Sequence, residues 1–145
     1  MSAEDSMRIL GSALGIIVAW ASRHDIYAET MRRARCDLTY GDSRLLGRLN
    51  AGGPLRIGEL ADLLGIDSST ITPQARRLQR TGLIMRAPDP TDGRAALLTI
   101  TPAGQKLLKR VNRSRRELLI ERLRDWPEAE RAAAAAALSR LANAL

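Results

Sequence analysis

With 145 residues, the chain is long enough to bury a hydrophobic core, and residues 1–145 are predicted to form a single domain. It has 23 Lys and Arg against 16 Asp and Glu, a net charge of +7 that favours a polyanionic partner such as nucleic acid. One Cys excludes an internal disulfide, and one His beside one Cys leaves no catalytic constellation, so neither an enzyme nor a cofactor is predicted.

The N-terminal part of the chain is predicted to form one long helix over residues 6–35. Its apolar side chains are spread too widely to pack on a single neighbouring helix, which indicates that a second chain covers them. The side chains that most need such cover are Ile9, Leu10, Ile17 and Trp20. A homodimer is therefore predicted.

The same segment bears on location and on metal binding. Its uncharged run, residues 9–22, is shorter than the roughly 20 residues that a membrane-spanning helix needs, and no signal-peptide cleavage pattern accompanies it. A single cysteine fits a reducing compartment. We therefore expect a cytoplasmic protein with no membrane partner. His24 has no further ligand at i+4, so no metal site is predicted.

The middle of the chain contains a helix followed by a helix-turn-helix. Thr39 with Asp42 resembles a capping box and is expected to start the first of these helices. The next has one apolar face and ends at Gly65; the third begins with Asp67 or Ser68 as its N-cap and ends at Gly82. Two helices joined by so short a turn present the second one to a DNA groove.

Two strand-like runs follow, residues 83–87 and 94–100, with a loop rich in proline, aspartate and glycine at residues 88–93. This pattern is typical of a β-hairpin, and a hairpin directly after a helix-turn-helix is a wing. Residues 55–57 are expected to add a short third strand. Thr101 and Pro102 then start a helix that extends to about residue 124, and residues 128–145 form the last helix.

These residues resemble the MarR family of bacterial winged-helix transcriptional regulators. The resemblance covers roughly residues 38–108 and is carried by Leu60-Ala61, Leu64-Gly65-Ile66, Ser69-Thr70-Ile71-Thr72, Arg77-Leu78, Gly82-Leu83-Ile84, Arg86, Asp89-Pro90 and Asp92-Gly93-Arg94-Ala95. It implies a mainly α fold with a small β-hairpin wing. The winged helix-turn-helix domain, residues 39–100, would be flanked by dimerisation helices at 6–35 and 102–145, which adds Leu118 and Leu141 to the predicted dimer contacts.

The exposed face of the second helix holds Ser69, Pro73, Arg76, Arg77 and Arg80, with Thr70 and Thr72 at its margins. Because the N-terminal half of such a helix usually meets base edges, we assign Ser69, Thr70, Thr72 and Pro73 to the floor of the groove. Arg76 and Arg77 are long enough to reach a guanine or a phosphate. Ser68 is expected to cap the helix, and Arg86 to contact DNA from the wing.

In the wing, the resemblance implies that Asp92 holds the side chain of Arg94, which enters the minor groove. The alternative is that Asp92 only shapes the turn. The cations on one side of residues 102–124 leave open a second DNA surface, although a solvated polar face is the commoner case.

The function predicted from these features is a homodimeric, sequence-specific regulator of transcription that represses from a pseudo-palindromic operator. The resemblance implies release from DNA by a small-molecule effector, but no residue identifies that ligand. The alternative function is a non-sequence-specific, architectural DNA-binding protein, for which positive charge alone would suffice.

Overall fold

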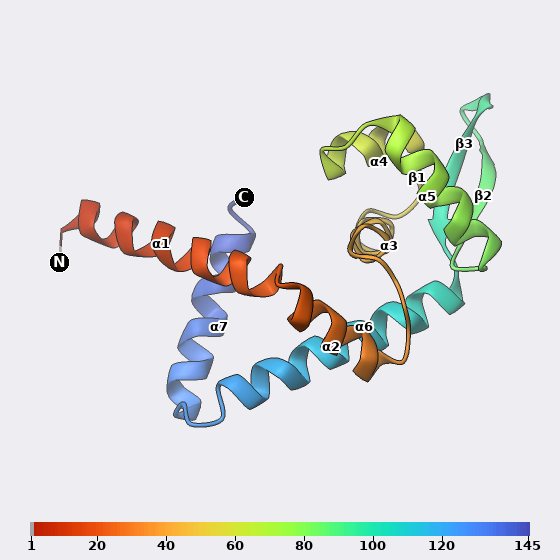
Figure 1. The fold of residues 1–145 in the computed structure, drawn as a ribbon. Helices are drawn as coiled ribbons and strands as arrows, with labels where there is room; N and C mark the ends of the chain where they lie inside the picture. The colour runs from red at the N-terminus through yellow and green to blue at the C-terminus, as the bar shows by residue number, and fades with distance from the viewer. Residues whose placement is uncertain (1) are drawn as a thin grey trace.

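A computed structural model describes residues 2–145 (Figure 1). The fold is mainly α-helical with a small antiparallel sheet, which confirms the predicted fold class. In chain order the elements are α1 (Ala3–Ala21), α2 (His24–Ala34), α3 (Tyr40–Gly52), β1 (Leu55–Arg56), α4 (Ile57–Leu64), α5 (Ser68–Arg80), β2 (Ile84–Asp89), β3 (Asp92–Ile100), α6 (Pro102–Arg122) and α7 (Glu128–Ala142).

The prediction of one long N-terminal helix is wrong, because the chain breaks between α1 and α2. Arg23 has an extended backbone, with φ −62° and ψ 137°, and its guanidinium binds Asp25 in the first turn of α2 at 2.8 Å. The Ser22 amide closes α1 by donating to the carbonyl of Val18 at 3.0 Å. Apolar spacing could not reveal this break, since the apolar positions continue on both sides of it.

The hydrophobic core lies between α2, α3, α4, α5, α6 and the sheet. Because the chain has no phenylalanine, aliphatic side chains fill this core almost alone. Those that are fully buried are Leu45, Leu46, Leu49, Leu60, Ile71, Leu78, Ile84, Leu98 and Val111. The apolar face predicted for the helix that ends at Gly65 is therefore part of this core.

The three strands form one antiparallel sheet in the order β1-β3-β2. Ile84 pairs with Ile100 at the base of the wing, and Asp89 pairs with Asp92 near its tip. The strands thus extend further than predicted, and only Pro90 and Thr91 remain between them. The reason is local: the Asp89 carboxylate accepts hydrogen bonds from the Thr91 amide at 2.9 Å and hydroxyl at 2.8 Å, which closes a tight turn.

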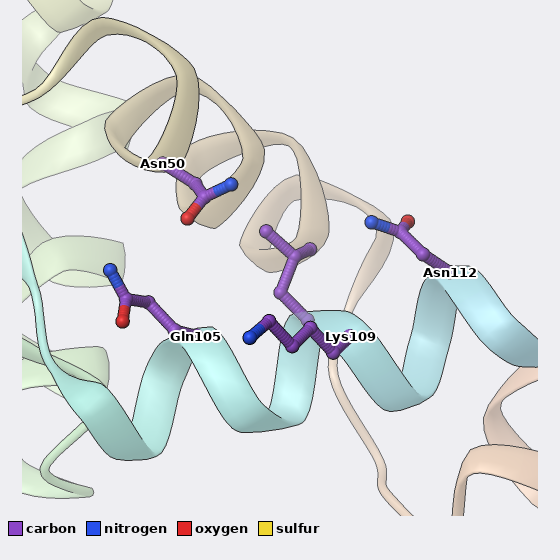
Figure 2. A pocket seen from close by; sticks show the side chains of 5 residues that line it. Asn50, Gln105, Lys109 and Asn112 are labelled. Atoms are coloured by element: carbon purple, nitrogen blue, oxygen red, sulfur yellow. The ribbon is translucent and has the colours of Figure 1, made fainter.

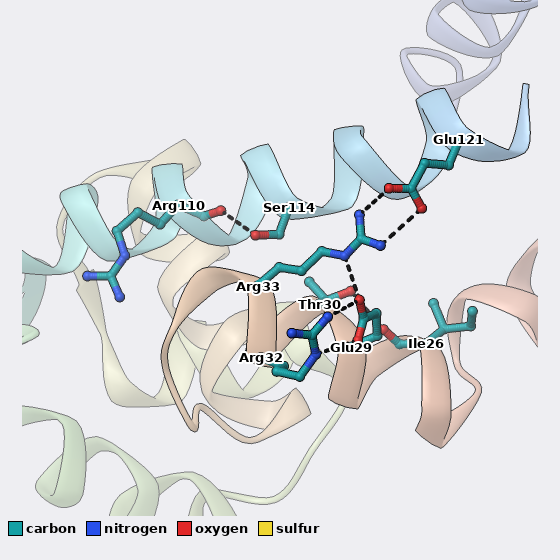
Figure 3. A network of polar contacts seen from close by, with 8 residues as sticks. All are labelled: Ile26, Glu29, Thr30, Arg32, Arg33, Arg110, Ser114 and Glu121. Atoms are coloured by element: carbon teal, nitrogen blue, oxygen red, sulfur yellow. Dashed lines mark hydrogen bonds and ion pairs between the residues drawn. The ribbon is translucent and has the colours of Figure 1, made fainter. Parts of the chain in front are cut away.

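Ionic contacts attach α2 to α6 (Figure 3). The Arg33 guanidinium donates to Glu29 on its own helix at 2.6 Å and to Glu121 on α6 at 2.6 Å. Hydrogen bonds from Arg32 and then Arg33 lower the pKa of Glu29 to about 2. Arg110 of α6 also donates to the carbonyl of Ala34. This carbonyl is at the C-terminal end of α2, where carbonyls have no partner within the helix.

Leu118 of α6 is buried within its own chain, with 6% of its surface exposed. It has little surface left for a partner, so its predicted place among the dimer contacts needs correction. By contrast, neither α1 nor α7 buries any residue. Figure 1 shows both helices at the end of the molecule away from the winged helix-turn-helix.

Gly104 lets the start of α6 approach the base of the wing. A Cβ atom at this position would meet the carbonyl oxygen of Leu83 and would lie 2.7 Å from Cγ1 of Ile100. The Thr101 amide and hydroxyl donate to the carbonyls of Leu83 and Gly82 at 3.0 and 2.6 Å, so the helix start is fixed there and cannot shift.

We therefore expect Gly104→Ala to lower the free energy of unfolding by about 1–3 kcal/mol through overpacking. Urea unfolding at one fixed protein concentration measures this difference. Gly47→Ala is the matched control, because a Cβ at Gly47 in α3 meets nothing within 4 Å. That change should leave stability equal or raise it by about 1 kcal/mol; equal losses in both variants would contradict the packing argument.

Candidate nucleic-acid interface

The turn between α4 and α5 sets the direction of the second helix. Gly65 ends α4 in the left-handed conformation with φ 65°. The carbonyl of Asp67 accepts the first hydrogen bonds of α5, from the amides of Thr70 and Ile71 at 2.9 and 3.1 Å. Asp67 is thus the N-cap, without a side-chain hydrogen bond, and Ser68 is the first helical residue. The prediction that Ser68 caps the helix is corrected accordingly.

The outer face of α5 carries a continuous stripe of exposed residues. Ser69, Pro73, Arg76 and Arg80 follow one another at i, i+4, i+7 and i+11. The opposite face is buried, with Ile71 wholly inaccessible. Pro73, Arg76 and Arg80, together with Gln79, also line a shallow surface depression. We refer to Ser69, Pro73, Arg76 and Arg80 as the α5 stripe.

Two threonines flank the α5 stripe and differ in how exposed they are. Thr70 is exposed, whereas Thr72 is half-buried. The Thr72 hydroxyl donates to the carbonyl of Ser68 at 2.7 Å, so its proton is used within the helix. It can therefore offer only lone pairs and its methyl group to a partner.

Arg77 lies beside the α5 stripe, and its guanidinium binds the carboxylate of Asp42 on α3. The Asp42 side chain is 5% exposed and also caps α3 by accepting the Thr39 amide at 3.0 Å. The Arg77 side chain remains 46% exposed. Arg77 therefore fixes α5 on α3 with one part of its guanidinium and leaves another part accessible. The sequence indicated the capping box of Asp42 but not this contact.

At the tip of the wing, Asp92 accepts a hydrogen bond from the backbone amide of Arg94 at 3.0 Å. This contact is to the backbone of Arg94 and not to its guanidinium. The Arg94 side chain is exposed, and within residues 2–145 no carboxylate pairs with it. Arg86 on β2 is exposed as well.

An ion pair between β1 and the end of β2 stabilises the tip of the wing, and the sequence did not predict it. Arg56 of β1 donates from Nε to Asp89 at 2.7 Å, and its terminal nitrogen lies 2.6 Å from the same oxygen. Hydrogen bonds from Thr91 and then from Arg56 lower the pKa of Asp89 to about 2. The Asp-Pro-Thr sequence could have indicated the turn, but nothing in it indicates Arg56, which is 33 residues away.

The arginines near this surface therefore divide into two groups. Arg56 and Arg77 have carboxylate partners and hold elements together. Arg76, Arg80, Arg86 and Arg94 are exposed and form no ion pair with the described part of the chain. Guanidinium groups without internal partners are available to bind phosphate oxygens or guanine. The sequence pattern also places Arg80 on this face, and its exposed guanidinium adds to the cations there.

Within residues 2–145, no group of three His, Cys, Asp or Glu side chains is placed to hold a metal ion. Among the same residues, no helix combines the length and the apolar composition that crossing a membrane requires.

Comparison with known proteins decides the family. The model of the MarR family matches residues 38–96. An uncharacterized HTH-type transcriptional regulator of Bacillus subtilis, YxaD, is 36% identical over 75% of this chain and 76% of its own length. The chain belongs to the MarR family.

Two further relatives agree with this assignment. The HTH-type transcriptional repressor IacR of Pseudomonas putida is 32% identical over 77% of this chain and 68% of its own. A MarR family protein of Bacillus stearothermophilus has a TM-score of 0.79 over 99% of this chain and 97% of that one, and at 22% identity it shows the shared fold alone. This MarR-family chain is thus a DNA-binding helix-turn-helix transcriptional regulator and not an enzyme.

The low pKa of Asp89 gives a prediction for the wing of this MarR-family protein. A carboxyl group whose pKa is lower in the folded chain stabilises folding above its ordinary pKa of 3.8, and that contribution is lost as the pH falls through about 2. Asp89→Asn should therefore be less stable than the unchanged protein at pH 7. The difference should shrink between pH 4 and pH 2, as measured by urea unfolding at a series of pH values. A difference that does not change with pH would contradict this role.

Proposed function

We propose that this regulator is a homodimer that represses transcription from a pseudo-palindromic operator. Each α5 enters a major groove, and the two grooves lie about one helical turn, roughly 10 base pairs, apart. The observation that carries the proposal is the α5 stripe, whose two arginines have no acidic partner within residues 2–145. Repression is supported by the relative IacR, which is named as a repressor.

The contacts follow from the exposure of each side chain. Ser69, Thr70, Thr72 and Pro73 lie on the N-terminal half of α5, the part that meets base edges in this kind of domain. Ser68, at the start of the helix, and the arginines Arg76 and Arg86 contact phosphates or guanine. Arg77 acts mainly by holding α5 against α3 and contacts the DNA backbone with its exposed part. Arg94 enters the minor groove, and Asp92 shapes the turn that presents it.

The dimer would form through α1 and α7. Ile9 and Ile17 of α1 are 50% and 46% exposed, and Leu10 is exposed as well. Trp20 and Leu141 are half-buried. Apolar surface of this extent along a helix that buries nothing in its own chain is typical of an interface between chains. Residues 6–35 and the C-terminal part of 102–145 would then serve dimerisation, and residues 39–100 DNA binding.

Release by a small molecule is supported by two surface pockets beside the DNA-binding elements. One, of about 180 Å³, lies between α3 and α6, where Figure 2 shows Asn50, Gln105, Lys109 and Asn112 around it. The other, of about 510 Å³, is bordered by Leu38, Asp42, Arg77 and Leu107. A ligand in the second cavity would act beside the Asp42–Arg77 ion pair. It would release DNA only by binding better to a conformer in which the two α5 helices are wrongly spaced.

The experiment that tests the function is selection of bound sites from a random duplex pool at about 150 mM salt, where weak binding to phosphates alone is largely screened. An enriched inverted repeat is expected. The alternative function, architectural DNA binding, gives retained binding without enrichment and a steep dependence on salt. It is the less favoured one, because the α5 stripe places hydroxyl and apolar groups, not only cations, on the outer face.

Removing the cation at the tip of the wing should weaken specific binding. We expect Arg94→Ala to reduce the free energy of operator binding by about 1–3 kcal/mol. Fluorescence anisotropy with the selected operator measures the effect, and thermal unfolding should be unchanged. Arg122→Ala, at the other end of α6, removes the same charge away from the DNA-binding elements and should bind normally. Equal affinities for both variants would remove the wing from the mechanism.

The chain should be a dimer in sedimentation experiments at micromolar concentration. Ile17→Glu, which places a charge in the apolar stripe of α1, should shift the protein towards monomer. Gly15→Glu adds the same charge on the opposite side of α1, where a Cβ meets nothing within 4 Å, and should leave the dimer intact. A stable monomer in the unchanged protein would defeat this architecture.

A further inference from the structure

Pro73 occupies an unusual position, because it lies inside α5 and at the centre of its exposed face. It is the sixth residue of a helix that begins at Ser68, and its ring is exposed between Ser69 on one side and Arg76 on the other. Proline in the interior of a helix is costly, since it removes a hydrogen bond and its ring crowds the carbonyl four residues earlier. A surface position would tolerate many residues that avoid this cost.

The missing amide of Pro73 leaves one backbone carbonyl of α5 without its helical donor. In an α-helix the amide of residue i donates to the carbonyl of residue i−4, so the carbonyl of Ser69 has no donor at position 73. The neighbouring Thr72 hydroxyl does not replace it, because it donates to the carbonyl of Ser68. The α5 stripe therefore combines an apolar ring with a backbone acceptor one helical turn earlier.

The bases of DNA differ in how well they match an apolar ring next to a hydrogen-bond acceptor. In the major groove, thymine presents a methyl group and adenine presents the N6 amine, a donor. Guanine presents two acceptors, N7 and O6, which the Ser69 carbonyl would repel. An apolar ring gains nothing from the amine of cytosine. The combination of ring and carbonyl therefore matches an A·T pair.

We propose that Pro73 determines specificity for an A·T pair at the centre of each half-site. Its ring packs against the thymine methyl, and the Ser69 carbonyl accepts a hydrogen bond from the adenine N6 amine. This inference rests on the proposed function, because it requires α5 to lie in the major groove. Arg76 and Arg80, further along the α5 stripe, contact guanine or phosphate and give no preference for thymine.

The test uses the selected operator with single-atom-group changes in its bases. Deoxyuridine in place of thymidine removes only the methyl group. Unsubstituted purine in place of adenine removes only the N6 amine, and with it one hydrogen bond of the base pair. Each change, made in one half-site only, should weaken binding of the unchanged protein about fourfold, which corresponds to the loss of one buried methyl-sized contact or one hydrogen bond. Fluorescence anisotropy competition measures the affinities.

Pro73→Ala is the matching protein variant. It removes most of the ring and restores the amide that occupies the Ser69 carbonyl, and alanine favours the helix, so the fold should be kept. With this variant both base changes should alter affinity less than about twofold, because neither partner contact remains. Arg80→Ala is the control. Relative to the unchanged protein, it should bind altered and unaltered DNA more weakly by the same factor.

The outcomes distinguish failure of the proposed function from failure of the role proposed for Pro73. Binding without any sequence preference in the unchanged protein would overturn the proposed function and this inference with it. Specific binding in which no thymine methyl couples to Pro73 would overturn this inference alone. Coupling that is present in the unchanged protein and absent in Pro73→Ala would establish it.

Discussion

The buried carboxylate of Asp42 is the contact on which the arrangement of the DNA-binding elements depends. It accepts the Thr39 amide at the start of α3 and binds the Arg77 guanidinium from α5. A carboxylate so far removed from water is unfavourable unless its oxygens are satisfied, and here each role supplies a donor. The orientation of α5 is therefore fixed by a charge pair on one side and by Ile71 and Leu78 in the aliphatic core on the other.

The same division of labour extends to the other arginines of this MarR-family chain. Those that meet carboxylates connect elements: Arg33 joins α2 to α6, and Arg56 joins β1 to the wing. Those without carboxylate partners in residues 2–145, such as Arg76 and Arg94, are exposed on α5 and at the wing tip. An arginine-rich composition thus serves two purposes, since internal pairing builds the domain and the remaining charge faces the partner.

The two ends of the molecule differ in the kind of side chain that they expose to solvent. The winged helix-turn-helix end has a closed aliphatic core and exposes polar and cationic groups. The α1 and α7 end exposes isoleucine, leucine and valine side chains and buries none of its residues. One surface is suited to a hydrated polyanion and the other to the removal of apolar area from water. A ligand that shifts α5 relative to the helices between these ends would couple them.

The sequence by itself determined the order of the elements, the wing and the residues on the outer face of α5. These features depend on local rules: the period of apolar residues, the capping box at Thr39, the glycine at position 65 and the proline after Thr101. The family resemblance carried by the same residues predicted DNA binding.

Only the tertiary structure decided what distant residues do to one another. The break at Ser22 and Arg23, the burial of Leu118 against its own chain, and the partners of Asp42 and Asp89 all escaped the sequence. The burial of Leu118 and the ion pairs of Asp42 and Asp89 depend on contacts between residues far apart in the chain, such as Arg56 and Asp89 at 33 positions. The break at Arg23 is local, but the apolar spacing continues across it. Periodicity and capping have a range of a few residues, and they cannot show which of many arginines finds a carboxylate when the chain folds.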